Sequence, residues 1–147
     1  MYTHILVPTD GSELSAKAVE QAITLARGMH ARVTFLYVQP EFPLPIAGEG
    51  ALLLPENREE FAHDTGEQAE RILTDACAQA AQAGVSAQSR TAISDVPYQV
   101  IINTADAEGC DLVFMASHGR KGLVGLILGS ETQKVLNHSK IPVLVCR

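Results

Sequence analysis

The residue types best suited to chemistry lie in a glycine-rich stretch of the last third of the chain. There Ala-Ser-His-Gly at 116–119 is followed by nine residues and then by Gly-Ser at 129–130. Glycine has no Cβ atom, so the backbone amides of such a loop stay accessible. We expect Ser130 to be the N-cap of a helix, with Gln133 completing a capping box. A helix start presents unpaired amides and the positive end of the helix dipole, which is the chemistry of a phosphate site.

Side chains within this stretch leave its chemistry open. The spacing also fits an ordinary connection between a strand and a helix, in which the glycines only permit tight turns. His118 suggests general-base catalysis, yet the sequence places no nucleophile and acid beside it, so we expect a structural or phosphate-lining role. Arg120 could contact phosphate oxygens or be a solvated charge. The remaining histidines show no metal-ligand spacing.

A second candidate, Asp10, follows the first apolar run of the chain, at 5–7. Its carboxylate could contact a ligand at the carboxyl end of a strand, or could be only an acidic charge at the start of the helix that Ser12 is expected to cap. Ligands of parallel sheets bind beyond the carboxyl ends of the strands, where the strand order reverses. If the strands at 5–7 and 112–115 flank that reversal, Asp10 and the glycine-rich stretch face each other across one crevice.

The elements that must position these residues alternate along the chain. Five apolar or alternating runs predict strands, and four segments with helical spacing of apolar residues predict helices between them. This alternation implies one domain, α/β in class, with a parallel sheet, right-handed crossovers and helices on both faces. The strands are expected at 5–7, 33–38, 85–93, 112–115 and 141–146, and the helices at about 13–29, 59–83, 96–107 and 131–137.

Three local features refine this prediction. Asp95 is expected to cap the helix at 96–107, with Pro97 in its first turn, where a missing N–H costs nothing. The alternating run at 85–93 is typical of a strand at a sheet edge. The segment 39–57 is rich in proline and carries three leucines at 52–54, so we expect a long loop that could fold over a ligand or a partner.

Composition argues against several classes of protein. The 147 residues suffice for one domain with a buried core, and a formal net charge of -6 with scattered basic residues argues against nucleic acid as a partner. No segment has the apolar length of a membrane span or the pattern of an export signal, so we expect a cytoplasmic protein without membrane contact. Cys77, Cys110 and Cys146 show no CxxC or metal-ligand spacing and are expected to be free thiols.

In combination, these motifs resemble the universal stress protein family. Its nucleotide-binding members carry Gly, two residues, Gly, nine residues and then Gly-Ser or Gly-Thr, a pattern that 116–130 matches except at its first position. The opening run at 5–12 and the closing run at 142–145 also resemble the family's terminal strands. The resemblance implies a doubly wound, parallel five-stranded sheet in the order 3-2-1-4-5.

The resemblance also implies a ligand, ATP with magnesium, and a regulatory role in the stress response rather than an enzymatic one. Asp10 would contact the nucleoside and the backbone of Val38 would face the adenine, while glycines and Ser130 would hold the phosphates. The full set of residues implied for nucleotide binding is Pro8, Thr9, Asp10, Val38, Met115, Ala116, His118, Gly119, Arg120, Gly129, Ser130, Glu131 and Thr132.

Ala116 departs from the family pattern, which has glycine at this position. If the position requires a positive φ, alanine strains the backbone; if glycine only leaves room, one methyl group is tolerated. The family also has a branch that lacks the motif and is not thought to bind ATP. A dimeric, protein-binding member of the same fold, with an unknown protein partner, therefore stays the alternative.

Two other classes of alternating α/β protein fit the sequence less well. A phospho-receiver domain requires paired acids after the first strand and a lysine after the fifth, and a dinucleotide-binding enzyme requires GxGxxG after the first strand. The chain has one Asp in that place and ends with Cys-Arg. We further expect ATP hydrolysis to be slow or absent, because the sequence assigns no residue to position water.

The last strand carries a prediction about assembly. Val143, Leu144 and Val145 form a short apolar strand with alternating faces. An unpaired edge of this kind invites pairing with a second copy of itself. The resemblance to the family implies the same arrangement, so we expect a homodimer through the C-terminal strand.

Overall fold

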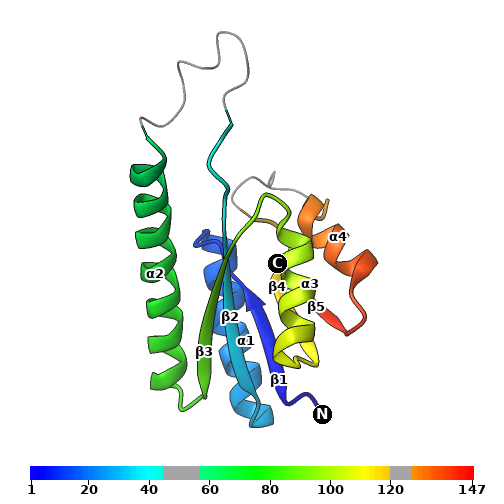
Figure 1. The fold of residues 1–147 in the computed structure, drawn as a ribbon. Helices are drawn as coiled ribbons and strands as arrows, with labels where there is room; N and C mark the ends of the chain where they lie inside the picture. Colours follow the sequence, from blue (N-terminus) through cyan, green and yellow to red (C-terminus); the bar gives the residue numbers. More distant parts are fainter. Residues whose placement is uncertain (45–56, 120–126) are drawn as a thin grey trace.

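The computed structural model describes residues 1–44, 57–119 and 127–147, in which strands and helices alternate (Figure 1). The leucines at 52–54, expected in a long loop, lie outside the described residues. The strands are β1 (His4–Pro8), β2 (Arg32–Gln39), β3 (Ala87–Ile93), β4 (Leu112–Ala116) and β5 (Val143–Cys146). The helices are α1 (Glu13–Met29), α2 (Arg58–Gln82), α3 (Pro97–Glu108) and α4 (Ser130–His138).

These strands form one parallel sheet in the order β3-β2-β1-β4-β5, which confirms the predicted topology. β1 lies at the centre, with Ile5 paired to Val33 of β2 on one side and to Leu112 of β4 on the other. The strand order reverses here, because β2 and β3 extend the sheet in one direction and β4 and β5 in the other. The carboxyl ends of β1 and β4 are therefore neighbours at the place where such sheets bind ligands.

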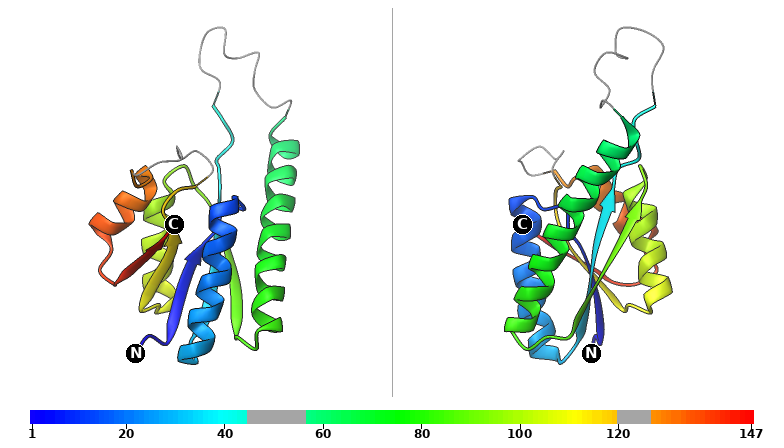
Figure 2. Two further views of the ribbon diagram at one scale, coloured as in Figure 1. Left: turned by 180° about the vertical axis from the view of Figure 1, so that it is seen from behind. Right: turned by 60° about the vertical axis from the view of Figure 1, so that its left-hand side comes forward.

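Helices cover both faces of the sheet (Figure 2). α1 and α2 pack on one face, where Ile5 and Val7 of β1 enter the core. α3 and α4 pack on the other face, where Leu6 and Leu36 are buried. Successive residues of β1 thus enter opposite cores, which is why the first strand is a continuous apolar run rather than an alternating one.

The starts of α1 and α3 test two predicted caps. Ser12 caps α1 as expected, since its hydroxyl accepts a hydrogen bond from the backbone N–H of Ser15 at 3.3 Å. The prediction for Asp95 is wrong: the N-cap of α3 is Val96, which makes no side-chain capping bond. Asp95 Oδ1 instead accepts the backbone N–H of Glu41 at 2.9 Å. This carboxylate fixes the segment after β2, not the helix that follows it in sequence.

β3 and β5 are the edges of the sheet, which confirms the edge position predicted for the alternating run at 85–93. On β5, Leu144 is exposed, whereas Val143 and Val145 pack against the core beneath α3 and α4. The strand therefore shows the two faces that its sequence predicts. A homodimer through β5 stays a prediction.

The cysteines are free thiols, as expected from their spacing. Cys110 and Cys146 are buried, and Cys77 is half-buried. Burial raises the pKa of the Cys110 thiol to about 12. Burial also raises the pKa of Cys77 and of Cys146. All three thiols are therefore protonated and weakly nucleophilic near neutral pH.

Candidate functional site

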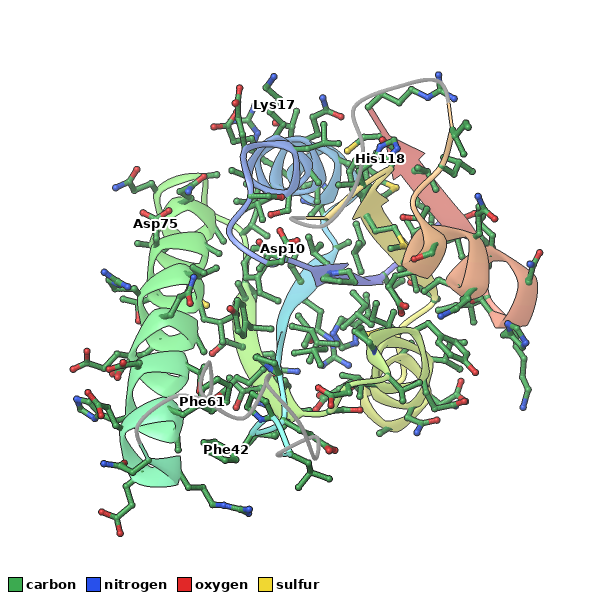
Figure 3. The ribbon with its side chains drawn as sticks, turned by 90° about the horizontal axis from the view of Figure 1, so that it is seen from above. Asp10, Lys17, Phe42, Phe61, Asp75 and His118 are labelled. Atoms are coloured by element: carbon green, nitrogen blue, oxygen red, sulfur yellow. The ribbon has the colours of Figure 1, made fainter. Side chains whose placement is uncertain are left out.

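The segments that follow β1 and β4 touch at the central reversal of the sheet. A Cβ atom added to Gly119 would stand only 2.6 Å from Asp10 Oδ2. The other carboxylate oxygen of Asp10, Oδ1, accepts the backbone N–H of Ser12 at 2.9 Å. Figure 3 looks down on this edge, with Asp10 near the middle of the molecule and His118 close to the ends of β4 and β5. Asp10 and Gly119, at the beginning of the glycine-rich stretch, thus lie side by side, as the strand order predicts.

Ser117, to which the sequence assigned no role, closes the base of the loop between β4 and α4. Its carbonyl oxygen accepts the backbone N–H of Gly129 at 2.8 Å and the hydroxyl of Thr132 at 3.1 Å. Its own N–H donates to the carbonyl of Cys146 at 2.8 Å. These bonds hold the first turn of α4 on the ends of β4 and β5. The only signal of this role in the sequence was the position of Ser117 inside the motif.

The start of α4 lies one residue earlier than the sequence predicted. Its N-cap is Gly129, and Ser130 is the first helical residue, with no side-chain capping bond. The expected capping box is therefore wrong: the side-chain amide of Gln133 donates to the carbonyl of Leu128 at 2.8 Å. A glycine cap has no side chain that could accept a bond from the first-turn amides. The helix start is consequently less crowded than a serine cap would make it.

A close approach of the backbone at 117–118, rather than an unusual backbone conformation, favours glycine at position 129. Its φ of -60° and ψ of 151° are extended values that any residue adopts. An added Cβ atom, however, would stand 3.0 Å from the carbonyl oxygen of Ser117 and 3.3 Å from the Cα of His118. A side chain at this position therefore requires the backbone after β4 to shift by a few tenths of an ångström.

Ala116, the departure from the family pattern, lies at the end of β4 and is buried. Among the described residues other than glycine, only His30 has a positive φ, so Ala116 adopts an ordinary strand backbone. The methyl group packs in the core beneath α1 and α2. Of the two readings of this position, backbone strain is thus excluded, and the methyl group is accommodated.

His118 is tied to the residue before it. Its Nδ1 lies 3.0 Å from the hydroxyl oxygen of Ser117. The ring carbon Cδ2 also lies beside Gly129, at 3.7 Å from the position of an added Cβ atom. These contacts orient the imidazole at the base of the loop, and a structural or phosphate-lining role stays a prediction for it.

Glu131 and Thr132 were expected in the nucleotide site because they follow Gly-Ser. The carboxylate of Glu131 instead accepts the backbone N–H of Tyr98 at 2.9 Å, at the start of α3. Its other oxygen lies 3.1 Å from Nζ of Lys134. The hydroxyl of Thr132 donates to the carbonyls of Ala116 and Ser117, each at 3.1 Å. Both side chains therefore hold the helix in place, and nothing in the sequence indicated the partner of Glu131.

The other predicted residues lie around the ends of β1, β2 and β4. Pro8 ends β1, and the buried Thr9 after it donates its N–H to the carbonyl of Leu36 at 2.9 Å. Val38 lies near the end of β2 and is half-buried. Met115 is buried in the core beneath α3 and α4, so only its backbone could reach a ligand. Arg120 lies outside the described residues.

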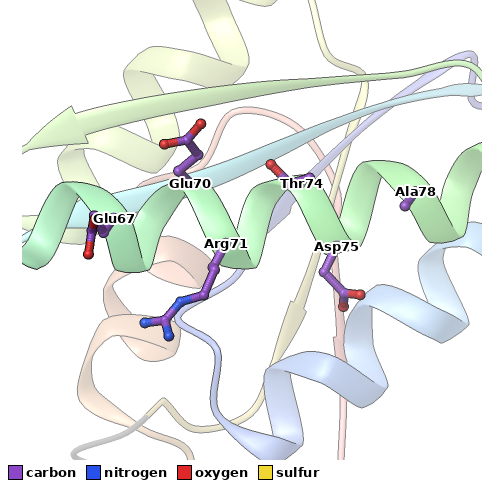
Figure 4. Close-up of a pocket in the computed structure, with 6 residues that line it drawn as sticks. All are labelled: Glu67, Glu70, Arg71, Thr74, Asp75 and Ala78. Atoms are coloured by element: carbon purple, nitrogen blue, oxygen red, sulfur yellow. The ribbon is translucent and has the colours of Figure 1, made fainter.

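Other kinds of site find little support in the part of the chain that the structure describes. No group of three or more His, Cys, Asp or Glu side chains there is placed to hold a metal ion. None of the described helices is long and apolar enough to cross a membrane. A surface hollow on α2 is lined by Glu67, Glu70, Arg71, Thr74, Asp75 and Ala78 (Figure 4). These are exposed side chains of a single helix, away from the reversal of the sheet, so the hollow does not enclose a ligand.

The fold defines an alternating α/β protein whose candidate site lies where the strand order reverses, at the segments that follow β1 and β4. The model of the universal stress protein family matches residues 1–147. The chain therefore belongs to the universal stress protein family, as its motifs indicated.

The chain is similar over nearly its whole length to other universal stress proteins and to solved structures. The chain is 34% identical to the universal stress protein YxiE of Bacillus subtilis, over 100% of both chains. It resembles the solved structure of MJ0577 from Methanocaldococcus jannaschii, with a TM-score of 0.80, 28% identity and coverage of 99% of this chain and 95% of that one. A universal stress protein solved in complex with cAMP has a TM-score of 0.71 and 26% identity, with coverage of 99% and 97%.

Proposed function

We propose that this protein binds ATP, with its phosphates at the start of α4. The observation that carries the proposal is the construction around Gly129: a helix start without a side-chain cap, held on the end of β4 by the carbonyl of Ser117. First-turn amides and the helix dipole favour an anion at such a place. The relative solved with cAMP supports an adenine nucleotide as the ligand class.

The parts of the nucleotide have different proposed contacts. The phosphates, accompanied by magnesium, lie against Gly119, Gly129 and the amide of Ser130. The carboxylate of Asp10 only accepts hydrogen bonds, so it suits the hydroxyl groups of the ribose rather than a phosphate. The backbone at Val38 faces the adenine. The side chains of Met115 and Glu131 have no part in these contacts, because the first is buried and the second is bonded to α3.

The proposed role is regulatory binding rather than catalysis. His118, a side chain at the site that could act as a base, has its Nδ1 bonded to Ser117. Phosphoryl transfer requires a group that positions the attacking water as well as neutralisation of charge. We expect ATP turnover well below about 1 s⁻¹, the lower end of ordinary enzymes. A phosphate-release assay that measured turnover at or above that rate would contradict the regulatory role.

We also propose that the protein is a homodimer through β5. The strand lies at the sheet edge and exposes Leu144, which is 38% accessible. An unpaired parallel edge offers backbone groups for pairing with a second copy. Light scattering at tens of micromolar should report a dimer, and a monomer alone at that concentration would contradict this assembly.

Thermal unfolding with ATP and with adenosine tests the nucleotide proposal. A ligand that binds only the folded protein, at about 100 times its dissociation constant, stabilises it by about 2.7 kcal/mol. For a domain of this size that corresponds to a rise in Tm of about 5 to 10 °C. Adenosine should raise Tm less, because it lacks the phosphates that α4 is proposed to hold. Mass spectrometry of the denatured protein should also detect nucleotide retained through purification.

The control for this experiment is a nucleotide-free preparation made by unfolding and refolding. If ATP leaves its Tm unchanged, the nucleotide proposal is overturned. The protein-binding alternative would then be the better account of the same fold.

A further inference from the structure

Glu131 occupies the first turn of α4, yet its carboxylate is directed to another helix. Oε2 accepts the backbone N–H of Tyr98 at 2.9 Å, and Oε1 lies 3.1 Å from Nζ of Lys134. The first of these bonds joins residues 33 positions apart in the chain. Glu131 therefore connects the first turn of α4 with the first turn of α3.

The start of α3 has a specific need for such an acceptor. Its N-cap, Val96, makes no side-chain capping bond, and its first residue, Pro97, has no N–H. Tyr98 therefore carries the first N–H of the helix proper, which has no acceptor within the helix. A carboxylate is a strong acceptor for an N–H at the positive end of a helix dipole. Glu131 is thus the cap of α3, supplied by α4.

Contacts around this bond extend the junction between the two helices. The Nζ atom of Lys134, which pairs with Glu131, lies 5.5 Å from the centre of the Tyr98 ring. That ring lies 5.3 Å from the ring of His138 on the next turn of α4. Tyr98 also packs against the core beneath α3 and α4. The Glu131 bond is therefore the polar end of a packed surface that runs along α4.

Resting on the proposed function, we propose that Glu131 is a positioning residue of the nucleotide site. The carbonyl of Ser117 and the hydroxyl of Thr132 hold the first turn of α4 on the end of β4, and Glu131 holds the same turn on α3. Attachments to two different elements fix the direction of the first-turn amides toward the phosphates. With Glu131 detached, the turn is held on the β4 side alone, its amides turn away from that direction, and phosphate binding weakens.

The length of the Glu131 side chain and its charge can be changed separately, and the two roles predict opposite results for the shorter variant. Glu131→Gln keeps the length of the side chain and an oxygen that can accept from Tyr98, but it removes the negative charge beside the phosphates. Glu131→Asp keeps the charge but is shorter by one methylene group, so it loses the bond to α3. A positioning role predicts that Gln is tolerated and Asp is not. A role of charge alone predicts that Asp resembles the wild type and Gln binds phosphate more tightly.

Calorimetric titration of the full chain with ATP and with adenosine, in wild type and both variants, tests the proposal. Glu131→Asp should weaken ATP binding by about fivefold, the equivalent of one lost helix cap, and should leave adenosine binding unchanged. Glu131→Gln should bind ATP at least as tightly as the wild type. Glu13→Asp is the matched control, because Glu13 also lies in the first turn of a helix and pairs with a lysine, Lys17 at 3.5 Å, and its side chain is 89% exposed. It should bind ATP like the wild type.

Hydrogen exchange at the amide of Tyr98 gives a readout that needs no nucleotide. Exchange should be faster in Glu131→Asp and slow in Glu131→Gln. The inference is overturned if Tyr98 exchange is the same in wild type and Glu131→Asp, or if a wild type that binds ATP is matched by Glu131→Asp. A wild type that binds neither ATP nor adenosine would instead overturn the proposed function, and this role of Glu131 with it.

Discussion

The tripeptide Gly-Ser-Glu occurs twice at the carboxyl edge of the sheet, at 11–13 before α1 and at 129–131 before α4. In the first copy the serine is the N-cap, and in the second the glycine is. The same three residues thus begin two helices, on opposite faces of the sheet, in two registers. One start is closed by its own side chains, and the other is left open.

The closed start is built from local bonds. The Ser12 hydroxyl accepts the N–H of Ser15 at 3.3 Å, and the Ser15 hydroxyl donates to the carbonyl of Ser12 at 3.1 Å. Asp10 accepts the N–H of Ser12, and Thr9 lies 3.1 Å from Ser15 between their hydroxyl oxygens. Polar side chains therefore occupy the N-terminal start of α1, which leaves few backbone N–H groups there for a bound anion.

The open start is built from contacts between distant segments. Gly129 is held by the carbonyl of Ser117, and Glu131 is held by the amide of Tyr98. Because these attachments use the cap's backbone and an outward side chain, they do not occupy the first-turn amides of α4. The comparison shows that the same helix-start motif is capped by its own side chain in one place and left uncapped in the other. The anion site proposed at α4 therefore depends on tertiary contacts as well as on the motif.

The largest expected effect follows from the close approach at Gly129. Gly129→Val should lower the Tm of the unliganded protein by about 3 to 10 °C, because the side chain meets the backbone of 117–118 and overpacking costs about 1 to 3 kcal/mol. It should also abolish ATP binding. From the sequence alone, this variant is expected to lose the rise in Tm with ATP and to keep an unliganded Tm closer to that of the wild type. Gly28→Val is the control, since nothing lies within 4 Å of an added Cβ there. Calorimetry showing equal Tm values for the two variants would contradict the account.

The glycine of the closed start is required for a different reason. Gly11 has φ of 76°, in the left-handed region. Gly11→Ala should therefore lower Tm by about 3 to 7 °C, the equivalent of about 1 to 2 kcal/mol of backbone strain. Gly11→Asn should lose less, because asparagine tolerates this region better than alanine. Equal losses for the two variants, measured by thermal unfolding, would mean that space rather than φ selects glycine at this position.

The two serines should respond differently to the same substitution. Ser12→Ala removes the cap of α1 and should lower Tm by about 2 to 4 °C, from a loss of about 1 kcal/mol. Ser130→Ala should leave the unliganded Tm nearly unchanged, because Ser130 caps nothing. Thermal unfolding of the two variants measures this difference. An equal decrease in Tm for both serines would contradict the distinction between the closed and the open start.

The smallest effect is expected at Ala116. Ala116→Gly should lower Tm by about 1 to 4 °C, since glycine in a strand costs about 0.5 to 1 kcal/mol relative to alanine. Restoring the family's glycine should not tighten ATP binding, because the methyl group is packed in the core beneath α1 and α2. Titration of this variant checks the point. A clear gain in affinity would show that the alanine hinders the site after all.

The order of the strands was predictable, and the details of the site were not. Continuous apolar runs such as 5–7 identify buried strands, and the family resemblance supplies their order. The register of α4 was predicted wrongly because Gly-Ser before a helix suggests a serine cap, as it correctly does at Ser12. What moves the cap to Gly129 is the carbonyl of Ser117, which approaches only once β4 and α4 have packed.

Hydrogen bonds between residues far apart in sequence explain why the roles of two carboxylates differ from those predicted. Asp95 accepts from Glu41, 54 positions away, rather than from the helix it precedes. Glu131 accepts from Tyr98, which no local pattern connects to it. A carboxylate near a helix start satisfies whichever amide the tertiary structure brings within reach, so its partner cannot be deduced from the neighbouring residues.

An amide NMR titration of the ¹⁵N-labelled protein with ATP and with adenosine tests most directly whether phosphates bind at the start of α4. We expect ATP to shift the amides of Ser130, Glu131 and Thr132, at the open start, and adenosine to shift them much less. The amides of Glu13 and Ser15, at the closed start, should change little with either ligand. Larger ATP-dependent shifts at Glu13 and Ser15 than at 130–132 would place the phosphates at α1 and contradict the account.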